Sequence, residues 1–496
     1  MEESPIRLRC IGVIPSEGPA EITAPGAVSP EIRQRLQDSL VSSLLKSCPA
    51  DLWPGTMYLS NCPFPMLVTR NHLASLASLN KVLVTAIDDI VTRWVDPSAN
   101  FPARMPLHPV EERLLQWLDD AQHTGIIRPF RECRGSWRPD FLIEEQGGTE
   151  DRPEAFRICE INARFCWNGF MMNALGQDAL VDTGISGHEL VGATDSQSLF
   201  DGMHRLYNPR LPLHLLKDQE PGVDIHLYTH YARHLGQQVR FITPADLRLI
   251  PCNRSPGNKL CCLVHSRSPI KGDNFQNEAG EILEEVHQIQ LELHHHELLD
   301  LGYEMLQEIS LRCFNDMRTL LLVHDKRMLG VVLEEIDSFV ARKVLTPQEA
   351  SLLERGICET ILPGSNQLAQ LIERCRLQCG LKDEWLLKPA RSGKGEGIVF
   401  GRDMTPESWI SRLKELICPF MSAGGATYVI QKKVRQAKYD VLLKDATEVQ
   451  QLPIVGTYHA INGEFLGIGT WRSSPGPVCT VSHGGTWMCS VMQAEL

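Results

Sequence analysis

The chain has 496 residues, of which 43% are hydrophobic and 22% charged, a globular composition that excludes a disordered protein and allows several packed units. Its formal net charge of −12, with no Lys/Arg-rich run, excludes a general nucleic-acid binder because phosphate backbones need clustered cations. No apolar stretch reaches the ~18 residues of a membrane span and no signal-peptide pattern is visible, so we expect a cytoplasmic protein with free thiols on its cysteines.

The N-terminal part, residues 1–125, is predicted to be mainly helical. Ser29 at an N-cap position and Pro30 in a first turn mark the start of one helix. The expected helices cover 30–47, 72–95 and 109–122. Because this part carries no motif for nucleotide chemistry, we expect it to contribute to substrate selection.

Residues 126–185 change to a strand pattern. Arg138–Glu144 and Phe156–Asn162 are separated by a polar, Gly-containing stretch, which predicts a hairpin with a long loop. Two polar residues on each strand alternate with apolar ones, so each pair shares one face of its strand.

Residues 186–320 are predicted to form an α/β unit followed by helices. A strand-like start at Val223, a helix over 228–235 and a strand over 238–242 have the order of a strand-helix-strand unit. Amphipathic helices are expected over 277–311.

The last part, residues 321–496, begins where the strand-like run Leu320–Val323 meets a helix start close to Lys326. Helices are expected over 325–342 and 347–358, and a new α/β segment starts at Trp385.

A Gly-rich segment, Lys388-Pro-Ala-Arg-Ser-Gly-Lys-Gly-Glu-Gly397, joins two predicted strands. Glycines at alternate positions let the backbone approach a ligand and offer N–H groups to phosphate oxygens. The segment is not a Walker loop, because that spacing is absent and its flanks are strands. The alternative is a tight hairpin turn whose lysines are incidental.

The hairpin at 126–185 carries a second cluster, Arg138 and Asp140 on one strand and Glu160 and Asn162 on the other. If the strands pair, two carboxylates and an amide oxygen converge beside a guanidinium. Such an all-oxygen set suits Mg²⁺, which is held by few protein oxygens together with substrate phosphates. The alternative is a salt-bridged hairpin with no metal.

Two later segments complete the pattern. Thr427–Val434 is an apolar strand that ends in the polar pair Gln431 and Lys432, as strand ends beside an adenine do. Pro453–Gly469 is predicted to be a hairpin, followed by an exposed Arg472.

Taken in this order, the motifs resemble the ATP-grasp ligases with a permuted arrangement, of which glutathionylspermidine synthase is the type. There an Arg-x-Asp-Phe strand and a Glu-x-Asn strand precede the phosphate loop, as they do here. The resemblance covers roughly residues 130–496. It implies an α/β (α+β) ATP-grasp fold with a pre-ATP-grasp α/β domain in 186–320, an ATP-binding subdomain with a Gly-rich lid in 321–496 and a helical N-terminal region.

The resemblance also implies a role for each motif. It assigns magnesium to Asp140, Glu160 and Asn162, and neutralisation of the transferring phosphoryl group to Arg138 and Arg472. It assigns ATP to a set of lysines, loop residues and strand-end residues: Lys326, Lys388, Ser392, Gly393, Lys394, Gly395, Gly397, Gln431 and Lys432. The amidase half of some such synthases has no counterpart in residues 1–125, so amide hydrolysis is not expected.

The implied reaction is ATP-dependent formation of an amide from a small-molecule carboxylate and an amine through an acyl phosphate, with ADP and phosphate released. His483 is a candidate base for the amine, beside the alternative of a structural turn histidine. Two other hypotheses stay open, a phosphotransferase on the same fold and an ATP-binding module without catalysis. The first predicts a stable phosphorylated product, whereas the second predicts binding without turnover.

Overall fold

The computed structural model describes the chain with short gaps, and structural statements below refer to the described residues. These are residues 7–14, 21–145, 154–185, 189–222, 224–252, 257–265, 274–419, 427–444, 448–479, 481 and 484–494. The expected strand start at Val223, most of the loop between the two strands of the early hairpin, and His483 therefore lie outside the described residues.

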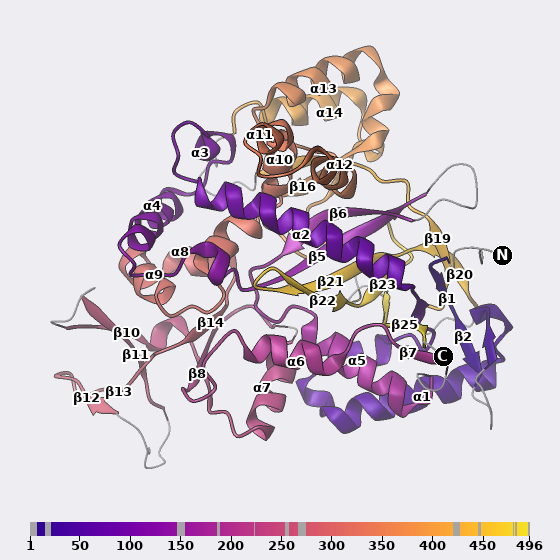
Figure 1. Ribbon diagram of the computed structural model, residues 1–496, viewed down its shortest axis with the longest axis horizontal. Helices are drawn as coiled ribbons and strands as arrows, with labels where there is room; N and C mark the ends of the chain where they lie inside the picture. The colour runs from indigo at the N-terminus through magenta and orange to yellow at the C-terminus, as the bar shows by residue number, and fades with distance from the viewer. Residues whose placement is uncertain are drawn as a thin grey trace.

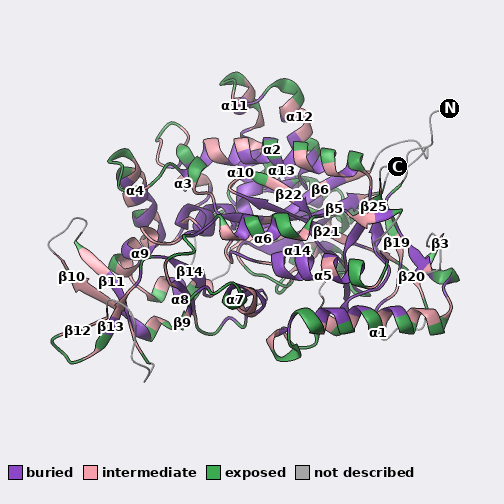
Figure 2. Cartoon of the chain, turned by 60° about the horizontal axis from the view of Figure 1, so that its bottom comes forward, coloured by how far each residue is buried: buried purple, intermediate pink, exposed green. Residues whose placement is uncertain are grey.

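An antiparallel sheet forms the centre of the molecule, with strand order β24-β23-β21-β5-β6 and with β22 paired to β21 (Figure 1). Buried residues are concentrated in these strands (Figure 2). The early hairpin is confirmed, because β5 pairs with β6 over most of its length. The strands are β5 Ser136–Glu144, β6 Ala155–Asn162, β21 Val455–Ile461, β22 Glu464–Ile468, β23 Trp471–Ser473 and β24 Thr486–Met488.

Helices cover this sheet. In Figure 1, α2 crosses above the central strands, whereas α5, α6 and α1 lie below them. The first helix begins as its sequence predicts, with the Ser29 side chain accepting a hydrogen bond from Ile32 N and Pro30 in the first turn. The helices are α1 Pro30–Ser47, α2 Arg70–Thr92, α5 Phe170–Asp182 and α6 Ser196–His204.

A second antiparallel sheet, of order β15-β18-β16-β17, has a small hydrophobic core of its own on one face. Helices α13 and α14 supply much of that core and cover this face, at the top of Figure 1. The elements are β15 Thr360–Ile361, α13 Asn366–Leu377, β16 Trp385–Pro389, β17 Val399–Phe400, α14 Pro406–Glu415 and β18 Tyr428–Lys432.

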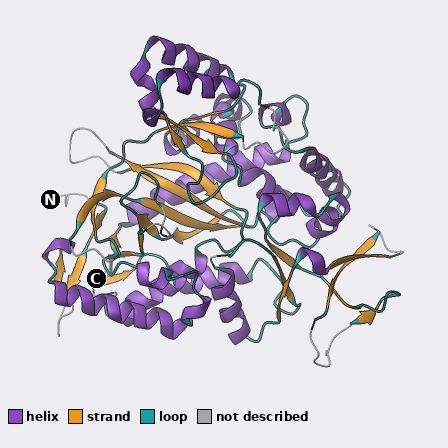
Figure 3. Ribbon diagram, turned by 180° about the vertical axis from the view of Figure 1, so that it is seen from behind, coloured by secondary structure: helices purple, strands orange, loops and turns teal. Residues whose placement is uncertain are grey.

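A parallel sheet of order β14-β8-β9 and an antiparallel sheet of order β10-β11-β13-β12 form the third region. The antiparallel sheet projects from the body of the molecule (Figure 3). The elements are β8 Leu213–Lys217, α7 Ile225–His234, β9 Val239–Ile242, β10 Leu247–Pro251, β11 Asn258–Leu263, β12 Phe275–Gln276, β13 Ile282–Glu285, β14 Ile289–Glu292, α8 His295–Asp300 and α9 Tyr303–Ser310.

The N-terminal part contains the expected helices and also pairs with the C-terminal end of the chain. Strand β4 runs parallel to β25, and β7 completes the sheet β1-β4-β25-β7. The remaining elements are β1 Arg9–Cys10, β2 Gly12–Ile14, β3 Glu21–Thr23, β4 Met66–Leu67, α3 Phe101–Arg104, α4 Pro109–His123, β7 Leu190–Gly192, α10 Arg327–Glu334, α11 Ile336–Ala341, α12 Pro347–Gly356, β19 Lys438–Val441, β20 Gln450–Pro453 and β25 Ser490–Gln493.

Two sequence predictions of local structure are wrong. The segment 277–311 contains strands β13 and β14 before its helices, because β13 pairs with β11 and β14 pairs with β8, partners that lie far along the chain. The run Leu320–Val323 lies in a π-helical segment, Thr319–Val323, and is fully buried there. A short buried apolar run fits a strand and a helix equally well.

Two global features agree with the composition. No described helix is long and apolar enough to cross a membrane. Each of the sixteen cysteines is a free thiol, as expected.

Candidate active site

The pairing of β5 with β6 brings the two halves of the early motif together. Asp140 lies opposite Glu160, and Arg138 lies opposite Asn162. Residues directly opposite on antiparallel strands project from the same face, so the four side chains form one polar cluster. The Asn162 amide donates hydrogen bonds to Asp140 Oδ1 at 3.1 Å and to Glu160 Oε1 at 3.4 Å.

Two arginines hold Asp140. Arg138 Nε lies 3.1 Å from Asp140 Oδ1, and Arg472, on β23, is ion-paired with the other carboxylate oxygen. Arg472 is half-buried rather than exposed, because this ion pair draws it against the sheet; the sequence prediction of an exposed arginine is wrong. Its Nε is buried and has no partner among the described residues, which leaves one donor for a ligand.

Two lysines act on Glu160. Lys326 Nζ lies 3.3 Å from Glu160 Oε2 and donates a hydrogen bond of 2.7 Å to the carbonyl oxygen of Ser392. Burial opposes ionisation of Glu160, but the charges of Lys326 and Lys388 outweigh it and hold the pKa of this carboxyl well below its usual range. The carboxylate is therefore charged at neutral pH.

The second sheet brings Lys388 and Gln431 to the same face. Lys388 is opposite Val429, and Gln431 is opposite Leu386, so the four side chains project away from the α13/α14 core. Gln431 Nε2 donates to Cys159 O on β6 at 3.2 Å, which ties this face to the central sheet. The site therefore lies between two antiparallel sheets.

The structure does not bring Lys432 into this cluster. It lies opposite Trp385 on the other face of the sheet, where it is exposed and pairs with Glu359 at 3.1 Å. Its ammonium lies 5.9 Å from the centroid of the Trp385 ring. Its assignment to ATP therefore gains no support from the geometry.

The Gly-rich loop between β16 and β17 has the backbone that its glycines predict. Lys394, Gly395 and Gly397 all have positive φ, at 56°, 74° and 74°. A Cβ on Gly395 would meet Val478 Cγ1 at 2.0 Å, so only glycine fits there. The carbonyl oxygen of Ser392 accepts from Lys326 at the start of the loop, which links the loop to the charged cluster around Glu160.

Sequence reasoning missed Arg391, which anchors the loop. Its side chain is 10% exposed, and its Nε donates to Asp325 Oδ2 at 2.8 Å while Nη1 donates to Glu111 Oε1 at 2.6 Å. His295 Nε2 lies 2.7 Å from the same Nη1. A helix of the N-terminal part, α4, thus contributes Glu111 to the support of the loop. The position of Arg391 inside the Gly-rich motif was the available signal.

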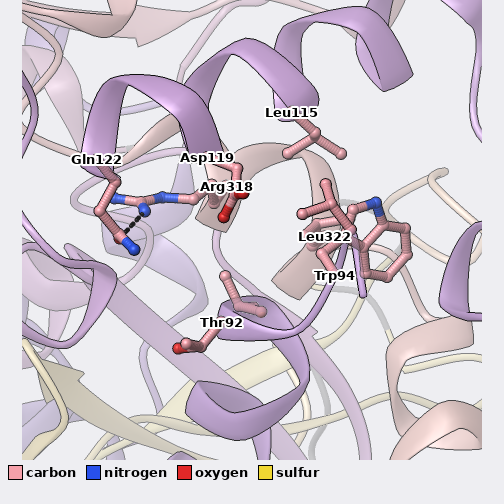
Figure 4. Close-up of a pocket in the computed structure, with 9 residues that line it drawn as sticks. Thr92, Trp94, Leu115, Asp119, Gln122, Arg318 and Leu322 are labelled. Carbon is pink, nitrogen blue, oxygen red and sulfur yellow. Dashed lines mark hydrogen bonds between the residues drawn. The ribbon is translucent and has the colours of Figure 1, made fainter. Parts of the chain in front are cut away.

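A small pocket elsewhere does not carry this chemistry. It lies between α2, α4 and the π-helical segment and is lined by Trp94, Leu115, Gln122, Arg318 and neighbours (Figure 4). Arg318 donates to Gln122 Oε1 at 2.6 Å and to Asp316 Oδ1 at 2.8 Å. Its guanidinium is engaged by the protein, so the pocket offers no free cation.

The cluster on β5 and β6 fits a magnesium ion by its chemistry. Within the described residues no group of three or more His, Cys, Asp or Glu side chains surrounds a metal position. Two carboxylates and one amide are nevertheless the kind of set that holds Mg²⁺ together with substrate phosphates. Asn162 now turns its Nδ2 toward both carboxylates, and rotation of the amide by about 180° would present Oδ1 instead.

Comparisons with known proteins show which family the chain resembles. Residues 79–322 match the family model described as the AnkG N-terminal domain. The chain is 36% identical over 479 residues to the ATP-grasp enzyme ankG of Aspergillus thermomutatus, a match that covers 94% of this chain and 95% of that protein.

A glutathione synthetase-like effector (GSS30) from Globodera pallida, solved in its apo form, shares the fold with a TM-score of 0.52 and 13% identity. The match covers 95% of this chain and 99% of that one, and at this identity it shows the fold alone. The predicted ATP-grasp fold is thereby confirmed. Together with the 36% identity to ankG over nearly the whole length, this places the chain among the ATP-grasp enzymes.

Proposed function

We propose that this protein is an ATP-dependent carboxylate–amine ligase that forms an amide through an acyl phosphate and releases ADP and phosphate. The observation that carries the proposal is the charge balance between the two sheets. Arg138, Arg472, Lys326 and Lys388 supply four positive charges, and Asp140 and Glu160 supply two negative ones. The surplus of two positive charges suits the phosphates of ATP.

Each cation has a distinct task in this proposal. Lys388 makes no hydrogen bond or ion pair with any described residue, so its ammonium is available to a phosphate oxygen. Lys326 bridges Glu160 and the loop and holds a second phosphate oxygen. Arg138 and Arg472 flank Asp140, where they neutralise charge on the transferring phosphoryl group and then on the acyl phosphate.

Magnesium would be held by Asp140, Glu160 and Asn162. The ion supplies charge neutralisation of the ATP phosphates when it is bound. Glu160 is ionised at neutral pH and Asp140 is oriented by two guanidiniums, so both carboxylates are ready to accept a cation.

The Gly-rich loop would exclude water from the acyl phosphate. A carboxylate must be converted into an electrophile, and the acyl phosphate that results is easily hydrolysed. The loop starts at Arg391, which is anchored in the protein, and continues into residues of positive φ that can hinge over a ligand. Lys326 joins loop and phosphate site, so closure and nucleotide binding are linked.

The substrates are proposed to be a small-molecule carboxylate and an amine, with no nucleic acid and no membrane partner. The free thiols on all cysteines support a reducing compartment, and we place the protein in the cytoplasm.

The test is ADP release from MgATP by the full-length protein with pooled carboxylates and amines, followed by mass spectrometry of every positive pool. The ligase predicts ADP that depends on both substrates and a product lighter than their sum by one water. A stable phosphorylated product formed without any amine would favour a phosphotransferase and refute the ligase. The Lys388→Met variant is the negative control, because it removes a phosphate contact.

A further inference from the structure

A group of buried polar residues lies at one end of the parallel sheet, outside the cluster described above. From β8 the chain continues through α7 to β9 on one side, and it later adds β14 on the other side of β8. The carboxyl ends of β8 and β14 therefore flank a topological switch point. In open α/β sheets, ligands bind in the crevice at such a point.

Three carboxyl groups lie at this end of the sheet. Glu220 follows β8, Asp224 precedes α7 and Glu292 ends β14, and all are buried, with exposures of 4%, 2% and 4%. Asp224 Oδ2 accepts a hydrogen bond of 2.7 Å from Met171 N, but Oδ1 has no partner in the described residues. On β14, Gln290 is fully buried, and its Oε1 also has no partner there. Buried acceptors without partners are costly, so their presence points to a ligand that donates hydrogen bonds.

A guanidinium without partners lies beside these carboxyl groups. Arg164 makes no hydrogen bond or ion pair with a described residue, and its Nε is buried. Its guanidinium lies 4.6 Å from the centroid of the Phe165 ring, and its charge interacts with those of Glu220 and Glu292. An arginine in this state has donors to spare for an anionic group, in contrast to the saturated Arg318.

We propose that this site binds the amine substrate and that this substrate is a zwitterion such as an α-amino acid. The ammonium group lies among Glu220, Asp224 and Glu292, and the carboxylate lies on Arg164. This inference rests on the proposed ligase function and names the class of its amine. We call these four residues the zwitterion site.

The zwitterion site is continuous with the phosphate site. Asp224 caps the first turn of α5 through Met171, and at that end of α5 a Cβ on Gly169 would meet the Arg138 side chain at 3.3 Å. On the other side, Lys394 of the Gly-rich loop lies 3.9 Å from Glu220. An amine held here is covered by the same loop that would cover the acyl phosphate.

The site also supplies a proton acceptor. Burial raises the pKa of Asp224 to about 7, and burial with the nearby charge of Glu220 raises the pKa of Glu292 to about 8. The Asp224 carboxylate can take one proton from the ammonium, because its pKa is matched to neutral pH. The free amine then forms a C–N bond to the acyl carbon, the C–O bond to phosphate breaks, and the departing phosphate takes the second proton.

The first test compares amino acids with amines that lack the carboxylate. The full-length enzyme, MgATP and a carboxylate from a positive pool are given arginine or agmatine, tyrosine or tyramine, and each other amino acid with its decarboxylated counterpart. The zwitterion site predicts amide formation with one or more amino acids and at least tenfold lower kcat/KM for the matched amine. Equal kcat/KM values for the amino acid and its decarboxylated counterpart would overturn this inference but would not refute the ligase function. The inference would also be overturned if no pair gave an amide and no amino acid raised the unfolding temperature of the enzyme.

The second test is the variant Arg164→Met, with Arg248→Met as the matched control. Arg248 lies on β10 of the projecting sheet, where it is paired with Glu281 and with none of the four residues of the zwitterion site. Loss of a charge-assisted contact predicts an increase of about 10- to 100-fold in KM for the amino acid, with little change for the decarboxylated amine. Arg164→Lys should restore part of the affinity. Equal effects of Arg164→Met on both amines, or on ATP alone, would contradict the assignment.

Discussion

Replacement of Asp140 by asparagine tests separately the two proposed roles of its cluster, magnesium binding and phosphate binding. Asp140 is 2% exposed and lies between the guanidiniums of Arg138 and Arg472. The substitution changes the balance of the cluster from four positive and two negative charges to four and one. Breaking a buried ion pair costs about 3–5 kcal/mol, and we expect the lower end because the two arginine side chains keep 13% and 20% exposure.

The Asp140→Asn substitution should have opposite effects on two ligands, magnesium and tripolyphosphate. Magnesium-dependent ADP release should be lost, because one of two carboxylates that would hold the ion is removed. Binding of tripolyphosphate without magnesium should be unchanged or tighter, because the positive surplus of the site increases. Urea unfolding, ADP release and calorimetric titration of tripolyphosphate with and without magnesium measure these effects.

Asp88→Asn is the matched control for this experiment. Asp88, on α2, is ion-paired with Arg134 and makes no hydrogen bond or ion pair with the described residues of the cluster around Asp140, so its substitution should reduce stability without affecting turnover. Unchanged ADP release by Asp140→Asn would refute the magnesium assignment. Weaker binding of metal-free tripolyphosphate would refute the argument from surplus charge.

Three further outcomes follow from the site. Lys388→Met should weaken ATP binding at least tenfold, since it removes a charged contact, whereas Lys432→Met on the opposite face should leave the dissociation constant unchanged. Arg391→Lys should lower the free energy of unfolding by about 3 kcal/mol in urea titrations, because one ammonium cannot bridge Asp325 and Glu111. An unchanged urea concentration at the unfolding midpoint would contradict this expectation. The folded-state pKa of Glu160 is depressed, so its contribution to stability is fully present above the unfolded-state value of ~4.3 and is lost as pH falls from there through the depressed folded-state pKa. Glu160→Gln should therefore flatten the acid limb of a stability–pH curve, and a curve of wild-type slope would count against the pKa shift.

Local spacing allowed the polar cluster on β5 and β6 to be predicted. Residues two apart on a strand share a face, so Arg138 with Asp140 and Glu160 with Asn162 were expected to converge once the strands paired, and they do. The Gly-rich loop and the helix start at Pro30 were predicted for similar reasons, because glycine spacing and cap residues act over a few positions.

Contacts between distant segments were not predictable in this way. The segment 277–311 has an apolar and acidic pattern that suits helices, yet β14 forms because β8 offers it a parallel edge. Lys432 follows Gln431 directly, but alternate residues of a strand project from opposite faces, and only the packing of α13 and α14 shows which face is covered.

The sequence by itself determined the order and chemistry of the motifs, and through them the ATP-grasp fold and the cations that we propose bind phosphate. Only the tertiary structure decided which residues support them. Arg391 meets Glu111 across 280 positions of the chain, and Arg164 comes to lie beside Glu220 and Glu292. No local pattern encodes such pairs, because they depend on how separate elements pack and on which buried polar groups are left without partners.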